Sequence, residues 1–297
     1  MLSSRFARRV CLAVWCALAA SPASGAPSSP TIVVVAAENF YGDIVGQIAG
    51  DDVRVTSIIS DPNVDPHEYE TNPRDAAAVA NARLIIQNGL GYDAFIDHLV
   101  AASPNPRRKL IVVSELTGHA KGDNVHLWYD PATIPKVAQV ILDALVQIDP
   151  GSATSYRNRY QGFQASLAPL NHAIAGIKAQ YGGAPVACTE PVFGYMAAAL
   201  GLVVLTPLSF QKAIEEGEDP PAPALAQMED HLRQHQVKVL LYNTQTVSPI
   251  TTRVQQLAKS VGVPVVGVSE TKPPGKTFQQ WMLSQLGQLR LALGRGK

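Results

Sequence analysis

The chain has 297 residues, of which 46% are hydrophobic and 16% charged, and its 24 Lys and Arg balance 24 Asp and Glu. This length and apolar content suffice for two domains with buried cores and argue against a disordered chain. Because there is no basic surplus or arginine-rich run, we expect a small partner and no nucleic acid.

The first 26 residues have the features of a secretory signal peptide. Three arginines precede an apolar run at 10–20, and the small residues SPASGA follow. This pattern predicts cleavage near residues 25 and 26. Without the signal arginines, 21 basic residues face 24 acidic ones, so the mature chain has a charge near −3. No later stretch approaches about 20 uninterrupted apolar residues, so we expect no membrane span and an exported, soluble protein.

Strands and helices alternate four times in the first part of the mature chain. The expected strands are 31–37, 53–59, 84–87 and 110–114. The expected helices are 38–48, 72–82, 92–102 and, after a loop at 115–130, 131–148. Alternation of this kind is typical of a parallel sheet with helices on its faces.

The stretch 150–181 predicts a long helix that connects two lobes. Pro150 suits a first helical position, and Gly182 and Gly183 follow the last one. Its 32 residues would span roughly 48 Å, which exceeds the width of a small domain. Pro169 removes a backbone donor inside this stretch, so we expect a kink there or two abutting helices.

The alternation resumes after the connector. The expected strands are 184–189, 202–206, 237–242 and 265–268, and the expected helices are 191–200, 224–235, 250–261 and 277–293. Residues 211–223 hold four acids and three prolines, so we predict an irregular loop there. Its acids favour a solubilising role over the collection of cations.

The repeated order of elements predicts an α/β fold with two lobes, each with a mainly parallel sheet. We expect a signal peptide at 1–26 and an N-terminal α/β lobe at 27–130. Helices that include the interlobe connector are expected at 131–181, and a C-terminal α/β lobe at 182–297.

Four side chains of the metal-binding kind follow strand ends or lie in the loops between elements. His67 lies after the second strand, His126 between the fourth strand and the next helix, and Glu190 and Glu270 directly after strands of the second lobe. Ligands bind at the carboxyl ends of strands in open α/β sheets, so these residues are expected to converge in the interlobe cleft. Two imidazoles and two carboxylates suit a divalent transition metal.

Other residues are weaker candidates. Glu68, Tyr69, Trp128 and Asn243 are expected to flank the site. His231 and His235 have a spacing that permits zinc binding, although their polar neighbours favour a solvated helix. Cys188 is the one cysteine outside the predicted signal, and its apolar neighbours favour a buried thiol.

Three segments carry a resemblance to a known family: DPHEYE, NVHLWYDPATIPKVA and TEPVFGYMAAALGL. They resemble the metal-binding solute receptors of bacterial zinc and manganese ABC importers, over about residues 31–294. The resemblance implies that His67, His126 and Glu190 are ligands, and that Glu270 is the fourth because it follows the last strand. Many relatives carry a histidine at the third position or an aspartate at the fourth, so the identity of the metal stays open.

The resemblance implies a monomeric periplasmic receptor that captures one zinc or manganese ion and passes it to the membrane permease of an ABC importer. Two alternatives stay open: a receptor for a metal chelate or other small solute in the same cleft, and an exported zinc metallohydrolase. A site closed by four protein ligands disfavours the hydrolase, because catalytic zinc keeps an open position for water. We therefore expect no enzymatic activity.

Overall fold

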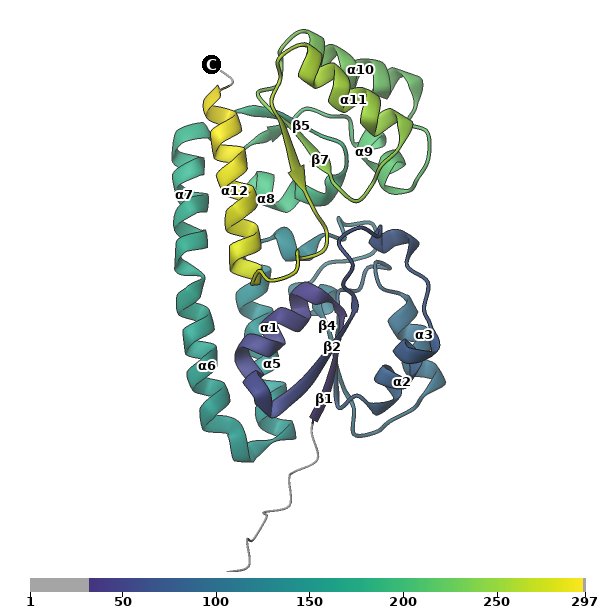
Figure 1. The fold of residues 1–297 in the computed structure, drawn as a ribbon, viewed down its shortest axis with the longest axis vertical. Helices are drawn as coiled ribbons and strands as arrows, with labels where there is room; N and C mark the ends of the chain where they lie inside the picture. Colours follow the sequence, from purple (N-terminus) through teal and green to yellow (C-terminus); the bar gives the residue numbers. More distant parts are fainter. Residues whose placement is uncertain (1–31, 296–297) are drawn as a thin grey trace, which may run out of the picture. The chain divides into compact units, whose positions relative to one another are not determined.

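Two four-stranded parallel sheets organise the chain, one in each lobe (Figure 1). The computed structural model describes residues 32–295, and the predicted signal peptide lies outside them. The first sheet contains β1 (Ile32–Glu38), β2 (Val53–Ile59), β3 (Leu84–Gln87) and β4 (Lys109–Val112). The second contains β5 (Pro185–Cys188), β6 (Val203–Val204), β7 (Leu240–Asn243) and β8 (Val265–Val268).

The two sheets share one topology. Their spatial orders are β2-β1-β3-β4 and β6-β5-β7-β8, and every pair of neighbours is parallel. In the first sheet Val34 pairs with Val55 on one side and with Leu84 on the other. The β-branched run of β1 is buried from Val34 onward because helices cover both faces of the sheet.

Five helices belong to the N-terminal half: α1 (Asn39–Ala49), α2 (Pro73–Asn81), α3 (Phe95–Ala102), α4 (Val113–Thr117) and α5 (Thr133–Ile148). The start of α2 is fixed by a capping box. The side chain of Asn72 accepts the backbone N–H of Asp75, and the carboxylate of Asp75 accepts the backbone N–H of Asn72. The helix α4 begins inside the predicted strand 110–114 and extends into the predicted loop 115–130, which also contains a 3-10 turn at Leu127–Tyr129. Both are too short to give a periodic apolar pattern.

The connector consists of two helices, α6 (Ala153–Ser166) and α7 (Ala168–Tyr181), separated by Leu167. This confirms the prediction of a break near Pro169, which lies in the first turn of α7, where its missing N–H needs no partner. Helix α6 contacts α1 and α5, and α7 contacts the last helix, α12 (Phe278–Arg295). Figure 1 shows α12 running beside α7.

The C-terminal half adds α8 (Gly194–Ala199), α9 (Leu208–Glu215), α10 (Ala222–Arg233) and α11 (Pro249–Ser260). The prediction of an irregular loop at 211–223 was wrong at both ends, because 211–215 belong to α9 and α10 begins at Ala222. Phe210 and Ile214 are four residues apart and buried, so they anchor α9 to the core in spite of the acids that follow.

One apolar cluster extends through both halves. It includes Val34 and Ile86 of the first sheet, Leu241 and Val268 of the second, and residues of α5, α7 and α12 between them. Asn39 adds a two-way polar link, because its amide donates to the carbonyl of Lys272 at 2.8 Å and its oxygen accepts the N–H of Lys272 at 2.9 Å. These contacts hold the two lobes together.

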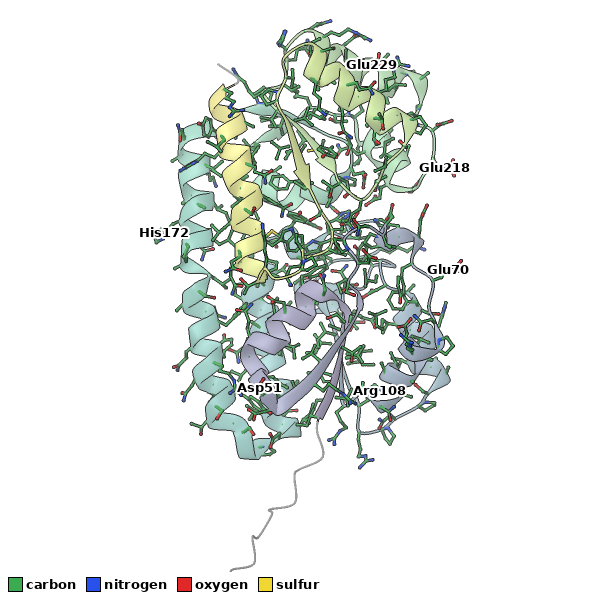
Figure 2. All side chains as sticks on the ribbon, viewed as in Figure 1. Asp51, Glu70, Arg108, His172, Glu218 and Glu229 are labelled. Carbon is green, nitrogen blue, oxygen red and sulfur yellow. The ribbon has the colours of Figure 1, made fainter. Side chains whose placement is uncertain are left out.

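The side chains in Figure 2 include exposed polar groups on the outer elements, such as His172 on α7 and Glu218 after α9. Among the described residues, none of the helices combines the length and the apolar character that crossing a membrane requires.

Candidate metal site

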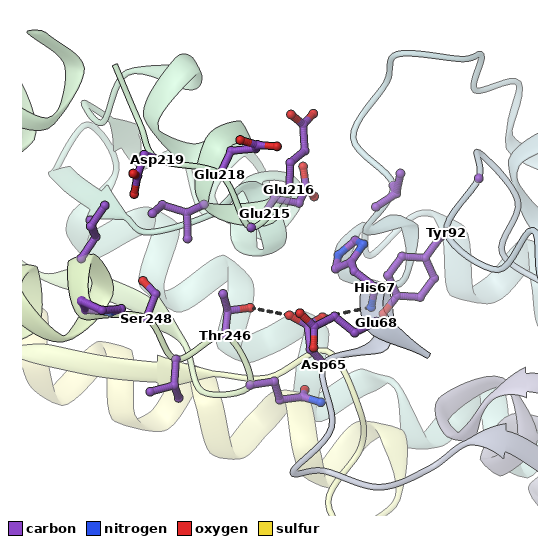
Figure 3. A pocket seen from close by; sticks show the side chains of 18 of the residues that line it. Asp65, His67, Glu68, Tyr92, Glu215, Glu216, Glu218, Asp219, Thr246 and Ser248 are labelled. Atoms are coloured by element: carbon purple, nitrogen blue, oxygen red, sulfur yellow. Dashed lines mark hydrogen bonds between the residues drawn. The ribbon is translucent and has the colours of Figure 1, made fainter. Parts of the chain in front are cut away.

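A cavity of about 850 Å³ opens between the two lobes. The loops that follow β2 and β3 supply one side, and the end of α9 and the loop after β7 supply the other. Figure 3 shows Glu216, Glu218 and Asp219 on one wall of this cavity and Asp65 with Thr246 on another. None of the described residues that line the cavity is a lysine or an arginine. Six of them are acidic: Asp65, Glu68, Glu215, Glu216, Glu218 and Asp219.

His67 lies in a 3-10 turn, Pro66–Glu68, at the edge of this cavity. Asp65 caps the turn, because its carboxylate accepts the backbone N–H of His67 at 2.9 Å. The hydroxyl of Thr246, from the other lobe, donates to the same carboxylate at 3.3 Å. The imidazole is 23% exposed and therefore accessible from the cavity.

His126 is fully buried, and its neighbours fix its tautomer. Its Nδ1 lies 2.7 Å from Oδ1 of Asn124, whose amide nitrogen donates to the carbonyl of Pro191 at 2.8 Å. The Asn124 oxygen must therefore accept, so Nδ1 of His126 carries the proton. Its Nε2 has no hydrogen-bond partner within residues 32–295 and lies 3.3 Å from Oε2 of Glu270.

Glu270 is the residue on which the site converges. It is fully buried, and its Oε2 lies 3.4 Å from Nε2 of His67 and 3.3 Å from Nε2 of His126. One ligand atom from each of these three residues lies within 4.8 Å of the others, which is the geometry of a shared ion. The hydroxyl of Tyr92 donates to the same carboxylate oxygen at 2.8 Å.

Glu190 is not part of this group of three, but it is linked to it. It is 1% exposed, and its Oε2 accepts a hydrogen bond from the amide of Asn243 at 2.9 Å. The same amide donates to Oε1 of Glu270 at 2.6 Å. The other oxygen of Glu190, Oε1, is buried and has no hydrogen-bond partner in the described part of the chain.

The charges of the site are strongly coupled. Burial raises the pKa of Glu270, but the adjacent imidazoles of His126 and His67 outweigh burial, so its pKa lies well below the usual range. Burial lowers the pKa of His67, yet the hydrogen bond and charge of Glu270 raise it to about 9. Burial and the charge of Glu270 raise the pKa of Glu190 to about 8. A divalent cation would compensate both carboxylates at once.

Three neighbours of the site were not predicted from the sequence: Tyr92, Asn124 and Glu215. Glu215 lies at the end of α9, with Oε1 3.6 Å from Nδ1 of His126. Asn124 stands two residues before the candidate ligand His126, and this proximity is the feature of the sequence that could have indicated it. Tyr92 follows β3, at a position that the sequence predicts as the start of a helix at 92–102.

The remaining candidates have other places. His231 is buried on α10, whereas His235 follows the end of that helix with a left-handed φ of 52°, so the two do not share a helical face. Cys188 is a buried free thiol, as predicted, and burial raises its pKa to about 12. Trp128 is buried, stacks on Phe40, and has its ring centre 5.2 Å from that of His126.

Comparison with known protein families decides the relationship. The family model described as zinc-uptake complex component A, periplasmic (ZnuA) matches residues 34–292. The chain belongs to the ZnuA family. The resemblance drawn from the three sequence segments is thereby confirmed.

Individual relatives of this ZnuA-family chain are distant. The metal ABC transporter substrate-binding lipoprotein FimA of Streptococcus parasanguinis is 26% identical over 267 residues, 84% of this chain and 82% of FimA. The manganese-binding lipoprotein MntA of Halalkalibacterium halodurans is 30% identical over 148 residues, 48% of each chain. The chain thus spans about half the length of MntA, and 60% of the iron-binding protein YfeA of Yersinia pestis.

Solved structures share the fold. The periplasmic zinc-binding protein TroA of Treponema pallidum superposes with a TM-score of 0.76 at 20% identity, covering 89% of this chain and 99% of TroA. A crystal structure of ZnuA gives 0.70 at 21% identity and covers 90% and 100%. The predicted two-lobe α/β fold with parallel sheets is confirmed.

Proposed function

We propose that this protein is the substrate-binding component of an ABC importer, and that it captures one divalent transition metal ion, zinc or manganese, between its lobes. His67, His126, Glu190 and Glu270 are the proposed ligands. The ion is the transported cargo, and a membrane permease is the partner that receives it. Export to the periplasm by cleavage of residues 1–26, action as a monomer and the lobe boundaries at 130 and 181 belong to the same proposal.

One observation carries the proposal. In the neutral ring of His126 the contact with Asn124 places the proton on Nδ1, so Nε2 has a free lone pair. This Nε2 lies 3.3 Å from Oε2 of Glu270 and makes no hydrogen bond within the described residues. Two buried lone pairs at this separation repel each other unless a proton or a metal cation lies between them. Two neutral imidazoles and two carboxylates together balance the charge of one divalent ion.

The cavity above the site favours a cation over an anionic chelate. Its six acidic residues would repel a carboxylate-bearing chelator, whereas they raise the local concentration of a hydrated cation. Binding rather than hydrolysis also agrees with the ligand set, since four side-chain ligands leave zinc no position for a reactive water. We therefore expect no turnover.

The proposal is tested by metal content and affinity. Stripped wild-type protein is expected to bind one zinc or manganese ion per chain, and His67→Ala and Glu190→Ala are each expected to weaken binding at least about a hundredfold. Mass spectrometry of the loaded protein and competitive titration measure both quantities. Thermal melts give an independent reading, because an ion at a thousand times its Kd stabilises the folded state by about 4 kcal/mol.

His172→Ala is the matched control for the histidine variant. His172 is exposed on α7, outside the cavity lining, so its loss is expected to leave the affinity unchanged. The assignment would be overturned if wild-type protein bound neither zinc nor manganese, or if wild type and both ligand variants bound the ion with equal affinity.

A further inference from the structure

Asn243 lies between the two carboxylates of the proposed site. It is the last residue of β7 and is 1% exposed. Its side-chain nitrogen lies 2.6 Å from Oε1 of Glu270 and 2.9 Å from Oε2 of Glu190, whereas the hydroxyl of Thr246 is more distant, at 3.1 Å. A single amide group therefore contacts both carboxylates.

The orientation of this amide is determined by its surroundings. Oδ1 of Asn243 accepts the backbone N–H of Gln245 at 3.1 Å, which leaves Nδ2 to face the acids. An amide nitrogen has two hydrogens, and the two shortest contacts assign one hydrogen to each carboxylate. The reverse orientation would place an oxygen against two carboxylate oxygens.

The neighbouring residue fixes the Glu270 backbone as well. Oε1 of Gln245 accepts the N–H groups of Glu270 and Thr271 at 2.7 and 3.0 Å, and its amide donates to the carbonyl of Val64 at 2.7 Å. Val64 lies three residues before His67. With this backbone fixed, the direction of the Glu270 carboxylate depends on its own side-chain contacts.

Each carboxylate has one oxygen engaged by Asn243 and one that is available. In Glu190 the available oxygen is Oε1, which is buried and has no hydrogen-bond partner. In Glu270 it is Oε2, which accepts the Tyr92 hydroxyl through one lone pair and faces both imidazoles. We propose that Asn243 is a positioning residue that restricts Glu190 and Glu270 to one metal-binding oxygen each, and thereby favours zinc over manganese. This inference rests on the function proposed above.

Coordination number explains the selectivity. Two imidazole nitrogens and two single oxygens make a four-donor set, which suits the tetrahedral preference of zinc. If both carboxylates bound through two oxygens, the same residues would supply six donors, closer to the octahedral environment typical of manganese. The amide protons of Asn243 compete for the two oxygens that this change requires.

The test compares zinc and manganese affinities of stripped wild type, Asn243→Leu and Asn243→Asp. Leucine removes both hydrogen bonds at nearly constant volume, and aspartate keeps the shape but donates at most one. The ratio of zinc to manganese affinity is expected to fall at least about tenfold in both variants, the lower end of the effect of residues that orient metal ligands. X-ray absorption of the zinc-loaded protein is expected to show four nitrogen and oxygen neighbours in wild type and more in Asn243→Leu.

Asn158→Leu is the matched control. It makes the same chemical change at an exposed position of α6, outside the cavity lining, so its affinity ratio should equal that of wild type. Equal loss of both affinities in a folded Asn243 variant, with an unchanged ratio and coordination number, would reduce Asn243 to a structural role and overturn the inference. Wild-type protein that binds neither ion would overturn the proposed function itself.

Discussion

Glu270→Gln is expected to weaken the binding of zinc or manganese roughly a hundred- to a thousandfold, because it removes the carboxylate oxygen on which the other groups converge. That oxygen lies within 3.4 Å of both proposed histidine ligands and accepts the Tyr92 hydroxyl. A four-ligand zinc site has a binding free energy of about 10–16 kcal/mol, so the loss of one ligand removes about a quarter of it, roughly 2.5–4 kcal/mol. Competitive titration with a chelator of known affinity measures the change.

The same substitution at Glu68 provides the control. Glu68 is exposed on the turn that carries His67, and it lines the cavity but is not one of the three converging residues. Glu68→Gln therefore alters the charge of the cavity but leaves the proposed ligands in place. An equal loss of affinity in both variants would show that the charge of the cavity, and not coordination by Glu270, accounts for binding.

The strands were the most predictable part of the fold. Predicted strands at 53–59, 84–87 and 265–268 coincide with β2, β3 and β8, because short β-branched runs between turn residues have few other structures available. Helix α9 was not predicted, because its buried residues Phe210 and Ile214 are close to a run of acids and prolines whose composition indicates a loop.

The gathering of three candidate side chains was predictable from the sequence, and their detailed contacts were less so. Strand ends indicate where His67, His126 and Glu270 gather, since the carboxyl ends of parallel strands form one edge of a sheet. The sequence could not show that Asn243, at the end of β7, contacts two acids. Glu190 follows β5 and Glu270 follows β8, and these two strands lie on opposite sides of β7 in the sheet. Such contacts depend on the order of the strands in space, which a single sequence does not give.

Glu38 illustrates a further limit. From the sequence it was expected at the start of the first helix, but it is the last residue of β1 and fully buried. Neither of its carboxylate oxygens accepts a hydrogen bond among the described residues. Its buried neighbour Asp93 accepts the backbone N–H groups of Asn88 and Gly89 at 2.6 and 2.8 Å. Because Glu38 and Asp93 interact, they cannot both be ionised unless a cation lies between them, so one of the two keeps a proton.

Glu38→Gln is expected to remove a loss of stability that wild type undergoes as the pH rises. Burial, and then the charge of Asp93, raise the pKa of Glu38 well above its usual value, so the folded state keeps a proton that the unfolded chain releases above about pH 4.3. A raised folded pKa gives stability that is present at low pH and lost as the pH rises toward that pKa. The loss is about 1.4 kcal/mol per pH unit for one group, over the range between its unfolded and its folded pKa.

The measurement is the free energy of unfolding of wild type and variant in urea from pH 5 to pH 8, in metal-free protein. Glutamine donates its amide hydrogen to Asp93 at every pH, so the variant should match wild type near pH 5 and exceed it increasingly toward neutrality. Glu70→Gln makes the same chemical change at an exposed position, so its free energy of unfolding should change with pH in the same way as that of wild type. A constant difference between wild type and Glu38→Gln across this range would mean that Glu38 is ionised in the folded protein. Asp93 and Glu38 would then need a cation rather than a proton between them.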